Sequence, residues 1–129
     1  MKVILPKQPL SNQHIYLQRW RNRFMIPKAK ELKQYYIDIL KQKKDLIKWK
    51  FYDEKIVMQV TFYHWDKRIR DIDNYCKLLL DSFEEAEVIK NDNNIIDLHL
   101  KKFYDKENPR TEVVIHTLND YKWFYRTYI

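Results

Sequence analysis

No glycine occurs among the 129 residues of this chain, although ordinary usage of about 7% would supply roughly nine. Turns that need a positive φ angle must therefore use the next most tolerant residues, asparagine and aspartate. Such residues gather at 91–94, and this segment is predicted to be a turn. The lack of glycine also excludes the P-loop and the EF-hand, because both motifs require it.

Length and composition predict one folded domain. Hydrophobic residues make up 45% of the chain, which is enough apolar surface for a packed core. The formal net charge of +7 creates a field that attracts polyanions, of which nucleic acid is the first candidate. No stretch approaches the ~20 apolar residues of a membrane-spanning helix, and no apolar signal segment begins the chain. We therefore expect a cytoplasmic protein that does not contact a membrane.

Hydrophobic periodicity predicts the order strand, helix, strand, helix, strand, strand. The simplest architecture with this order is an α+β fold in which two helices pack on a mixed four-stranded sheet. We assign residues 1–117 to the domain and 118–129 to an aromatic tail that packs on the domain or on a dimer partner. The expected elements are a strand at 3–5, a basic loop at 11–23, a helix from Pro27, an interior strand at 55–65, a helix from Asp73 to about Glu87, and strands at 95–103 and 112–118.

Two carboxylates stand at the junction between the interior strand and the second helix. Asp71 and Asp73 could point the same way if the backbone there is extended, and two such close anions favour a cation between them. Hard oxygen ligands of this kind suit Mg²⁺. The alternative is helix capping, since aspartate is favoured at N-caps and in first turns. A zinc site is not expected, because the chain has one cysteine and no zinc spacing among its histidines.

Two further residues favour the metal interpretation. Lys77 lies four residues after Asp73, so both would project from one helix face, where a cation can contact a phosphate. Its alternative role is an ordinary i, i+4 ion pair. Asp92 precedes the next strand and would return to the same neighbourhood if that strand lies beside the interior one. Its alternative role is turn formation.

These residues share a spacing that joins a strand, a helix and a turn. The pattern reads Asp71-Ile72-Asp73-Asn74-x-x-Lys77-x-x-x-Asp81, then Val88-Ile89-Lys90-Asn91-Asp92, then the strand 95–102. It resembles the signature region of the RusA-type crossover-junction endodeoxyribonucleases, which resolve Holliday junctions. Segments 9–16 and 26–30 resemble the family more loosely, and the tail from Leu118 lies outside the resemblance.

The resemblance implies a function. It assigns divalent-metal binding to Asp71, Asp73 and Asp92, an essential role to Lys77, and a homodimer that acts on branched DNA such as a four-way junction. The implied chemistry is phosphodiester hydrolysis assisted by Mg²⁺, with Mn²⁺ as a substitute. Many relatives have two consecutive acids where this chain has Asn91-Asp92, and a glycine shortly before. The conformation that this turn has in those relatives, and any role of their first acid, therefore cannot be transferred to this chain.

Basic residues are expected to contact the DNA backbone. The lysine-rich face of the first helix is compatible with DNA contact and with a solvated surface. Arg70 could equally be an ion-pair partner. Two histidines in strands, His64 and His99, are expected to be partly buried and hydrogen-bonded. Our candidates for DNA binding are Arg19, Arg21, Arg23, Lys67, Arg68 and Arg70.

Two competing hypotheses use the same features. The chain could be a non-catalytic basic DNA-binding protein of phage or bacterial origin, in which the carboxylates are structural. It could also be an assembly protein whose aromatic tail binds a partner. Metal-dependent cleavage of a junction, and its loss in an aspartate variant that still binds DNA, separates the nuclease from both.

Overall fold

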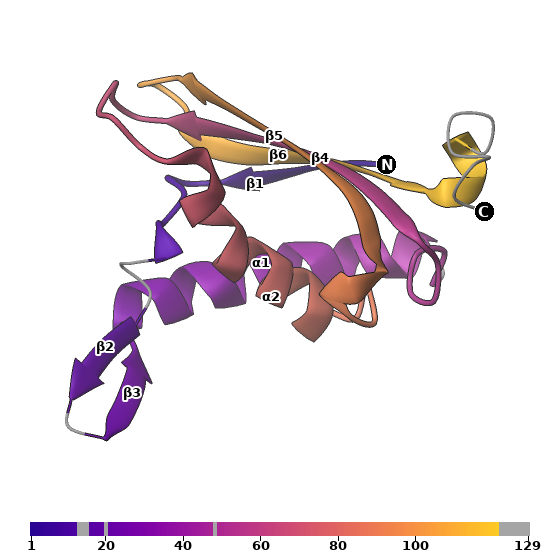
Figure 1. The fold of residues 1–129 in the computed structure, drawn as a ribbon, viewed down its shortest axis with the longest axis horizontal. Coiled ribbons are helices and arrows are strands. Elements are labelled where there is room, and N and C mark those ends of the chain that lie inside the picture. The colour runs from indigo at the N-terminus through magenta and orange to yellow at the C-terminus, as the bar shows by residue number, and fades with distance from the viewer. Residues whose placement is uncertain (13–15, 20, 48, 122–129) are drawn as a thin grey trace.

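The fold is a four-stranded mixed sheet with two helices on one face (Figure 1). The computed structural model describes residues 1–12, 16–19, 21–47 and 49–121, with only the backbone at 17–19 and 121. The strand order is β1-β6-β4-β5, and only the β4–β5 pair is parallel. The main sheet and helices comprise β1 (Lys2–Pro6), α1 (Pro27–Ile47), β4 (Ile56–His64), α2 (Cys76–Glu85), β5 (Ile95–Tyr104) and β6 (Arg110–Thr117).

The predicted α+β class is confirmed, but the chain order differs from the prediction in one place. A hairpin of β2 (Tyr16–Arg19) and β3 (Asn22–Met25) lies between β1 and α1. The prediction of a loop at 11–23 was therefore wrong at 16–19 and 22–23, which are in strands, and residues 13–15 and 20 lie outside the described residues. Its reason was the lack of a hydrophobic period, which a hairpin remote from the core does not need.

The core lies between the sheet and the two helices. On the helix-facing side of β4, Ile56, Met58, Val60 and Phe62 are each at most 1% exposed. The neighbouring Val57, on the other face, is also buried. β4 also lies between β6 and β5 in the sheet, which confirms the prediction of an interior strand, although Gln59 on its second face is exposed.

The two helices turn their apolar stripes toward this layer. The buried residues of α1 recur at helical spacing, from Ala29 and Leu32 to Leu40. In α2, Leu79 and Phe83 are buried as expected, whereas Cys76 and Leu80 are only partly buried. The predicted helix from Asp73 begins as a 3₁₀ turn, η2 (Ile72–Tyr75), and becomes α-helical at Cys76.

The end of α2 shows how the chain turns without glycine. Glu87 has a φ angle of 59°, its N–H donates to the Glu84 carbonyl, and the N–H of Val88 donates to the Phe83 carbonyl. These two bonds form a Schellman motif, in which glycine is the usual residue at the left-handed position. Among the described residues the other positive φ angles belong to Lys7 and Trp49. The prediction that asparagine and aspartate would take these angles was wrong.

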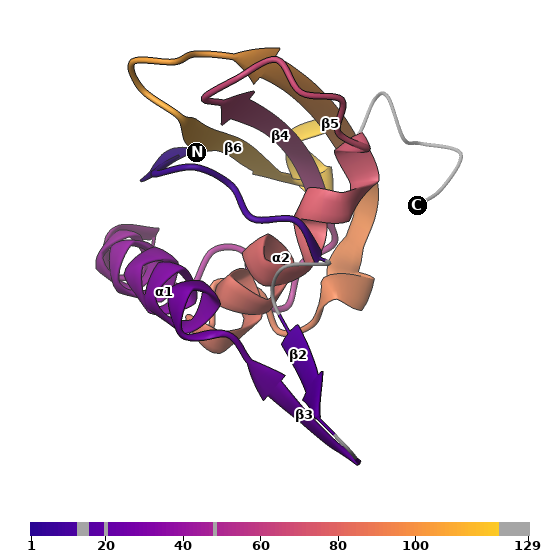
Figure 2. The ribbon, with the colours of Figure 1, turned by 90° about the vertical axis from the view of Figure 1, so that its left-hand side faces the viewer.

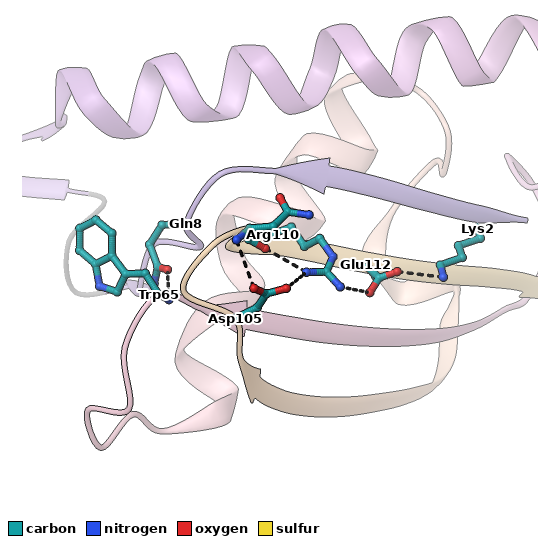
Figure 3. A network of polar contacts seen from close by, with 7 residues as sticks. Lys2, Gln8, Trp65, Asp105, Arg110 and Glu112 are labelled. Atoms are coloured by element: carbon teal, nitrogen blue, oxygen red, sulfur yellow. Dashed lines mark hydrogen bonds and ion pairs between the residues drawn. The ribbon is translucent and has the colours of Figure 1, made fainter.

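The sheet face that points away from the helices carries a network of charged side chains (Figure 3). The guanidinium of Arg110 lies 2.7 Å from Asp105 and 3.2 Å from Glu112, and Lys2 lies 2.8 Å from Glu112. The same guanidinium stacks on the ring of Tyr63, 3.8 Å from its centroid. These contacts tie β1, β4 and β6 to the β5–β6 turn.

Two further expectations concern membrane helices and the aromatic tail. No helix among the described residues is long and apolar enough to cross a membrane. The predicted packing of the aromatic tail concerns mainly residues 122–129, which lie outside the described residues.

Candidate metal and DNA site

Asp71 and Asp73 lie in the connection from β4 to α2. Asp71 has extended backbone angles (φ −77°, ψ 123°) and precedes η2, whereas Asp73 lies within η2, and both are exposed. The backbone is thus extended at only one of the two positions. Asp71 occupies the N-cap position of η2 but makes no side-chain capping bond. Capping, the alternative role, is therefore not what Asp71 does here.

Lys77 lies in the first turn of α2, where its backbone and its side chain both have polar or aromatic neighbours. The Lys77 N–H donates to Asn12 Oδ1 at 3.2 Å, so Asn12 satisfies one of the free donors that begin every helix. The Lys77 ammonium lies 3.4 Å from Asp81 and 5.9 Å from the centroid of the Tyr16 ring. The i, i+4 ion pair that was the alternative role thus exists, but its partner is Asp81.

Asp92 lies in the short 3₁₀ turn η3 (Asp92–Asn94) that precedes β5. Its N–H donates to a carboxylate oxygen of Glu84 at 2.7 Å. The side chain of Asn91 accepts the N–H of Asn93 at 2.8 Å, which is an Asx-type turn. The predicted turn at 91–94 is therefore present, and Asn91 supplies its side-chain hydrogen bond.

The three aspartates are distributed over both ends of α2. Asp71 and Asp73 precede its first turn, whereas Asp92 bonds to Glu84 near its last. A helix of ten residues is about 15 Å long. β5 does lie beside β4, as the prediction required. Even so, no three His, Cys, Asp or Glu side chains in the described part of this single chain form a group that could hold a metal.

The donor chemistry of these residues nevertheless fits a hard divalent cation. Within the part of the chain that the structure describes, Asp71, Asp73 and Asp92 form no ion pair. By contrast, Asp66 and Asp105 are each paired with an arginine. The three candidate ligands are therefore exposed carboxylates that form no ion pair with any side chain in the described ranges.

A pocket of about 580 Å³ opens beside Asp71. Its walls come from residues 8–11, from the start of α1, and from the connection 65–75. The lining combines cations, including Lys28 and Arg68, with Trp65, Tyr75 and Asn74. An anionic chain could therefore reach the carboxylate along a wall that carries compensating positive charge.

Comparison with known proteins decides the family. The sequence model of endodeoxyribonuclease RusA matches residues 6–116. The chain belongs to the RusA family. The crossover junction endodeoxyribonuclease RusA of Aquifex aeolicus (strain VF5) is 44% identical to it over 54 residues, which is 42% of this chain and 43% of that protein. This match thus spans less than half the length of the curated relative.

The predicted cations beside the RusA-family site have different environments. The Arg70 side chain is only 12% exposed, and its guanidinium lies 2.7 Å from the Asp66 carboxylate and 3.0 Å from the Asp66 carbonyl oxygen. Arg70 is thus an ion-pair partner, of Asp66 and not of Asp71. Arg68 is 80% exposed although it lies 3.4 Å from Asp66, and Lys67 is exposed beside the ring of Tyr104. The last two are better placed to reach a phosphate.

The arginines predicted in the basic loop belong to the hairpin of this RusA-family chain. Arg21 and Arg23 are exposed, and the Arg23 guanidinium lies 4.0 Å from the centroid of the Tyr16 ring. The side chain of Arg19 lies outside the described residues. Tyr16, the first residue of β2, thus contacts Arg23 of β3 and lies near Lys77 of α2. It belongs to segment 9–16, which resembles the family loosely. No sequence signal pointed to Asn12.

The histidine at the end of β4 is held in one tautomer. The Trp65 N–H donates to Gln8 Oε1, so the Gln8 amide must donate to Nδ1 of His64 at 2.9 Å. Burial of the ring, together with Arg70 and Lys102, lowers the pKa of His64 to about 4. The expected burial and hydrogen bonding are confirmed for His64. The Nε2 of His99 lies 2.9 Å from a carboxylate oxygen of Asp97, but the His99 side chain is 55% exposed, so its predicted burial was wrong.

Proposed function

We propose that this protein is a divalent-metal-dependent endodeoxyribonuclease that resolves Holliday junctions by paired nicks during recombination and repair. The observation that carries the proposal is the RusA family match, because residues 6–116 include Asp71, Asp73, Lys77 and Asp92. The curated relative is named as a crossover junction endodeoxyribonuclease. A cytoplasmic location, where such DNA would be met, is part of the same proposal.

In this proposal Asp71, Asp73 and Asp92 hold Mg²⁺, and Mn²⁺ can replace it. Their exposure and their lack of ion-pair partners among the described residues support this role. A bound divalent cation would supply Lewis acidity and an acidic water for attack on the scissile phosphate. Arg68 and Lys67 would contact flanking phosphates.

Lys77 would contact the scissile phosphate and stabilise the charge that develops on it. Asp81 and Tyr16 restrict where its ammonium can lie, and Asn12 fixes the helix turn that carries it. A positioned cation costs less reorganisation during the reaction than a freely moving one. Asp81 is therefore assigned a positioning role.

We further propose that a homodimer completes the metal site. Asp92 lies at the opposite end of α2 from Asp71 and Asp73, so a second chain that contributes Asp92 would supply the third carboxylate. A two-fold dimer would also place one site on each of two opposing strands of a junction. In this arrangement neither chain cleaves alone.

The first experiment measures cleavage of a synthetic four-way junction with Mg²⁺, with Mn²⁺ and with a chelator. We expect Asp73→Asn to reduce cleavage on the order of a thousandfold or more while junction binding persists. The matched control is Asp45→Asn, an exposed aspartate in α1, which should cleave normally. Binding without cleavage in either metal would favour the non-catalytic DNA-binding protein.

The second experiment tests the shared site by mixing two inactive variants, Asp73→Asn and Asp92→Asn. If each site combines Asp71 and Asp73 of one chain with Asp92 of the other, a mixed dimer contains one intact site and one doubly altered site. Single-strand nicking should then return, without paired cleavage. A site formed within one chain predicts no recovery in any mixture, because each site would lack one aspartate.

The aromatic tail is proposed to pack on its own domain or on the dimer partner. Deletion of residues 122–129 should then lower stability or weaken dimerisation. Unchanged dimerisation, solubility and cleavage would exclude both roles for the tail.

A further inference from the structure

The positive charge of this protein is concentrated at its N-terminal end. Residues 1–30 contain seven lysines and arginines and no aspartate or glutamate. Residues 31–129 contain eighteen basic and eighteen acidic residues and are formally neutral. The first thirty residues therefore account for the whole formal charge of +7. This segment is therefore a strong candidate for the long-range attraction of a polyanion.

The hairpin is the part of this segment that extends farthest from the rest of the fold (Figures 1 and 2). It projects from the start of α1, away from the sheet and from both helices. Residues 21–24 are all exposed, and among the hairpin side chains that the structure describes, Tyr16 and Met25 at its base pack against the core. Two antiparallel strands of this length form a narrow ribbon, which is an element that DNA grooves admit.

The cations continue from the hairpin into α1. The first turn of α1 contains no acidic residue, and Lys28 and Lys30 lie there exposed. Because cations near a helix N-terminus oppose the helix dipole, helix stability does not explain them. Lys28 also lines the pocket that contains Asp71. The basic surface thus leads from the hairpin to the proposed metal ligands.

Contacts at the base of the hairpin connect it with the proposed site. The ring of Tyr16 lies under the Arg23 guanidinium at 4.0 Å and near the Lys77 ammonium at 5.9 Å. Asn12, in the segment that leads into the hairpin, bonds to the Lys77 N–H. The orientation of the hairpin is therefore coupled to the helix turn that carries Lys77.

We propose that the β2–β3 hairpin is a docking arm that binds one duplex arm of the branched DNA next to the cleavage site, and that it provides a major share of the phosphate contacts. The proposal rests on the proposed nuclease function, because that function supplies the DNA. Exposed arginines without acidic partners among the described residues fit a DNA backbone better than an apolar partner.

The decisive measurement is the dependence of junction affinity on salt concentration. Each phosphate contact contributes about 0.9 to the slope of log K against log salt. For each chain bound to the junction, the double variant Arg21→Gln/Arg23→Gln should therefore lower the slope by about 2, and Arg21→Gln alone by about 1. The single variant leaves the contact between Arg23 and Tyr16 intact, so its result does not depend on preserving the hairpin in the double variant.

The matched control is the double variant Lys50→Gln/Lys55→Gln. Both lysines are exposed and lie beyond the far end of α1 from the hairpin, within the neutral part of the chain. Removing the same two charges there should change the slope by much less than the hairpin variants do. Equal effects from both pairs would overturn the proposal, because they would indicate an unspecific response to net charge.

Cleavage separates failure of the docking arm from failure of the nuclease function. At enzyme concentrations below saturation, single-turnover cleavage by Arg21→Gln should fall in proportion to its loss of junction binding, whereas the Lys50→Gln/Lys55→Gln control should cleave within about threefold of wild type. If wild type cleaves and the hairpin variants keep its salt slope, only the docking arm is wrong. If wild type neither binds nor cleaves junctions, the proposed function itself fails.

A protection experiment places the DNA on the hairpin directly. Asn22→Cys introduces a thiol into β3, and Asn119→Cys introduces one near the end of the described chain. Burial raises the pKa of the native Cys76 thiol to about 11. Labelling of the protein without an introduced cysteine measures the background that Cys76 contributes. Junction DNA should slow maleimide labelling of the Asn22→Cys variant at least about fivefold and leave the Asn119→Cys variant unaffected. Equal labelling with and without DNA at Asn22→Cys would overturn the proposal.

Discussion

The β2–β3 hairpin and the sheet with its two helices are built on different physical principles. The sheet and helices bury large side chains such as Phe62 and Phe83, and several of their charged side chains form ion pairs. The hairpin exposes Arg21, Arg23 and Phe24, and its described side chains reach the core at its base. Because of this contrast, we expect stability and the proposed attraction of DNA to depend on separate regions. Substitutions in one region should therefore affect one property without the other.

The largest effect on stability is expected from Phe83→Ala. Phe83 is fully buried in α2, and truncating such a ring costs about 3–5 kcal/mol of unfolding free energy because a cavity remains. The matched variant in the hairpin is Phe24→Ala, which removes a ring that is 51% exposed. It should change stability by less than about 0.5 kcal/mol. Urea denaturation compares the two, and similar losses would show that the hairpin shares the core.

A smaller effect should follow from protonation of His64. Its pKa is lowered from 6.5 to about 4 in the folded protein, so protons bind the unfolded chain more tightly. Its contribution is therefore present above pH 6.5 and is lost as the pH falls through 4, at up to about 1.4 kcal/mol per pH unit. Urea midpoints between pH 7 and 4 should show this slope in wild type and a flatter one in His64→Gln.

The same titration sharpens the contrast between the two regions. Arginine does not lose its charge in this pH range, so the hairpin contribution to the salt slope should stay constant while stability declines. A salt slope that followed the His64 titration would mean that the two regions are strongly coupled.

The smallest of these effects concerns the contact between the two regions. Asn12→Ala removes the acceptor for the Lys77 N–H and should cost about 1 kcal/mol of stability, as capping substitutions usually do. Asn12→Asp keeps an acceptor and should retain most of that stability. Thermal unfolding measures both variants. Equal losses would indicate that Asn12 stabilises the chain through packing and not through its hydrogen bond.

Much of the fold was predictable because its elements face the core. The helical stripe of α1 and the apolar faces of β4 depend on burial, which leaves a period in the sequence. The hairpin leaves no such period, since it is held by its own ladder and by the contact between Arg23 and Tyr16. The left-handed conformation of Glu87 was missed because it depends on where α2 ends and not on the residue type. The helix ends there and the next residue, Val88, is buried.

The site was predictable in composition but not in arrangement. Spacing alone brought Asp71 and Asp73 together in one connection, where the structure also has them. For Asp92 the sequence could not show whether the turn before β5 lies at the same end of the sheet as Asp71 and Asp73. In a parallel pair the segment after β4 and the turn before β5 lie at opposite ends of the two strands, so the separation follows from topology.

The absence of glycine also has a consequence for the unfolded chain. An ordinary residue in place of glycine restricts the denatured ensemble and favours the native state by about 0.4–1 kcal/mol where its native angles are unstrained. Lys7, Trp49 and Glu87 oppose this benefit, because a side chain in the left-handed region costs about 1–2 kcal/mol. The rest of the backbone loses less configurational freedom on folding than a glycine-containing chain of equal length would.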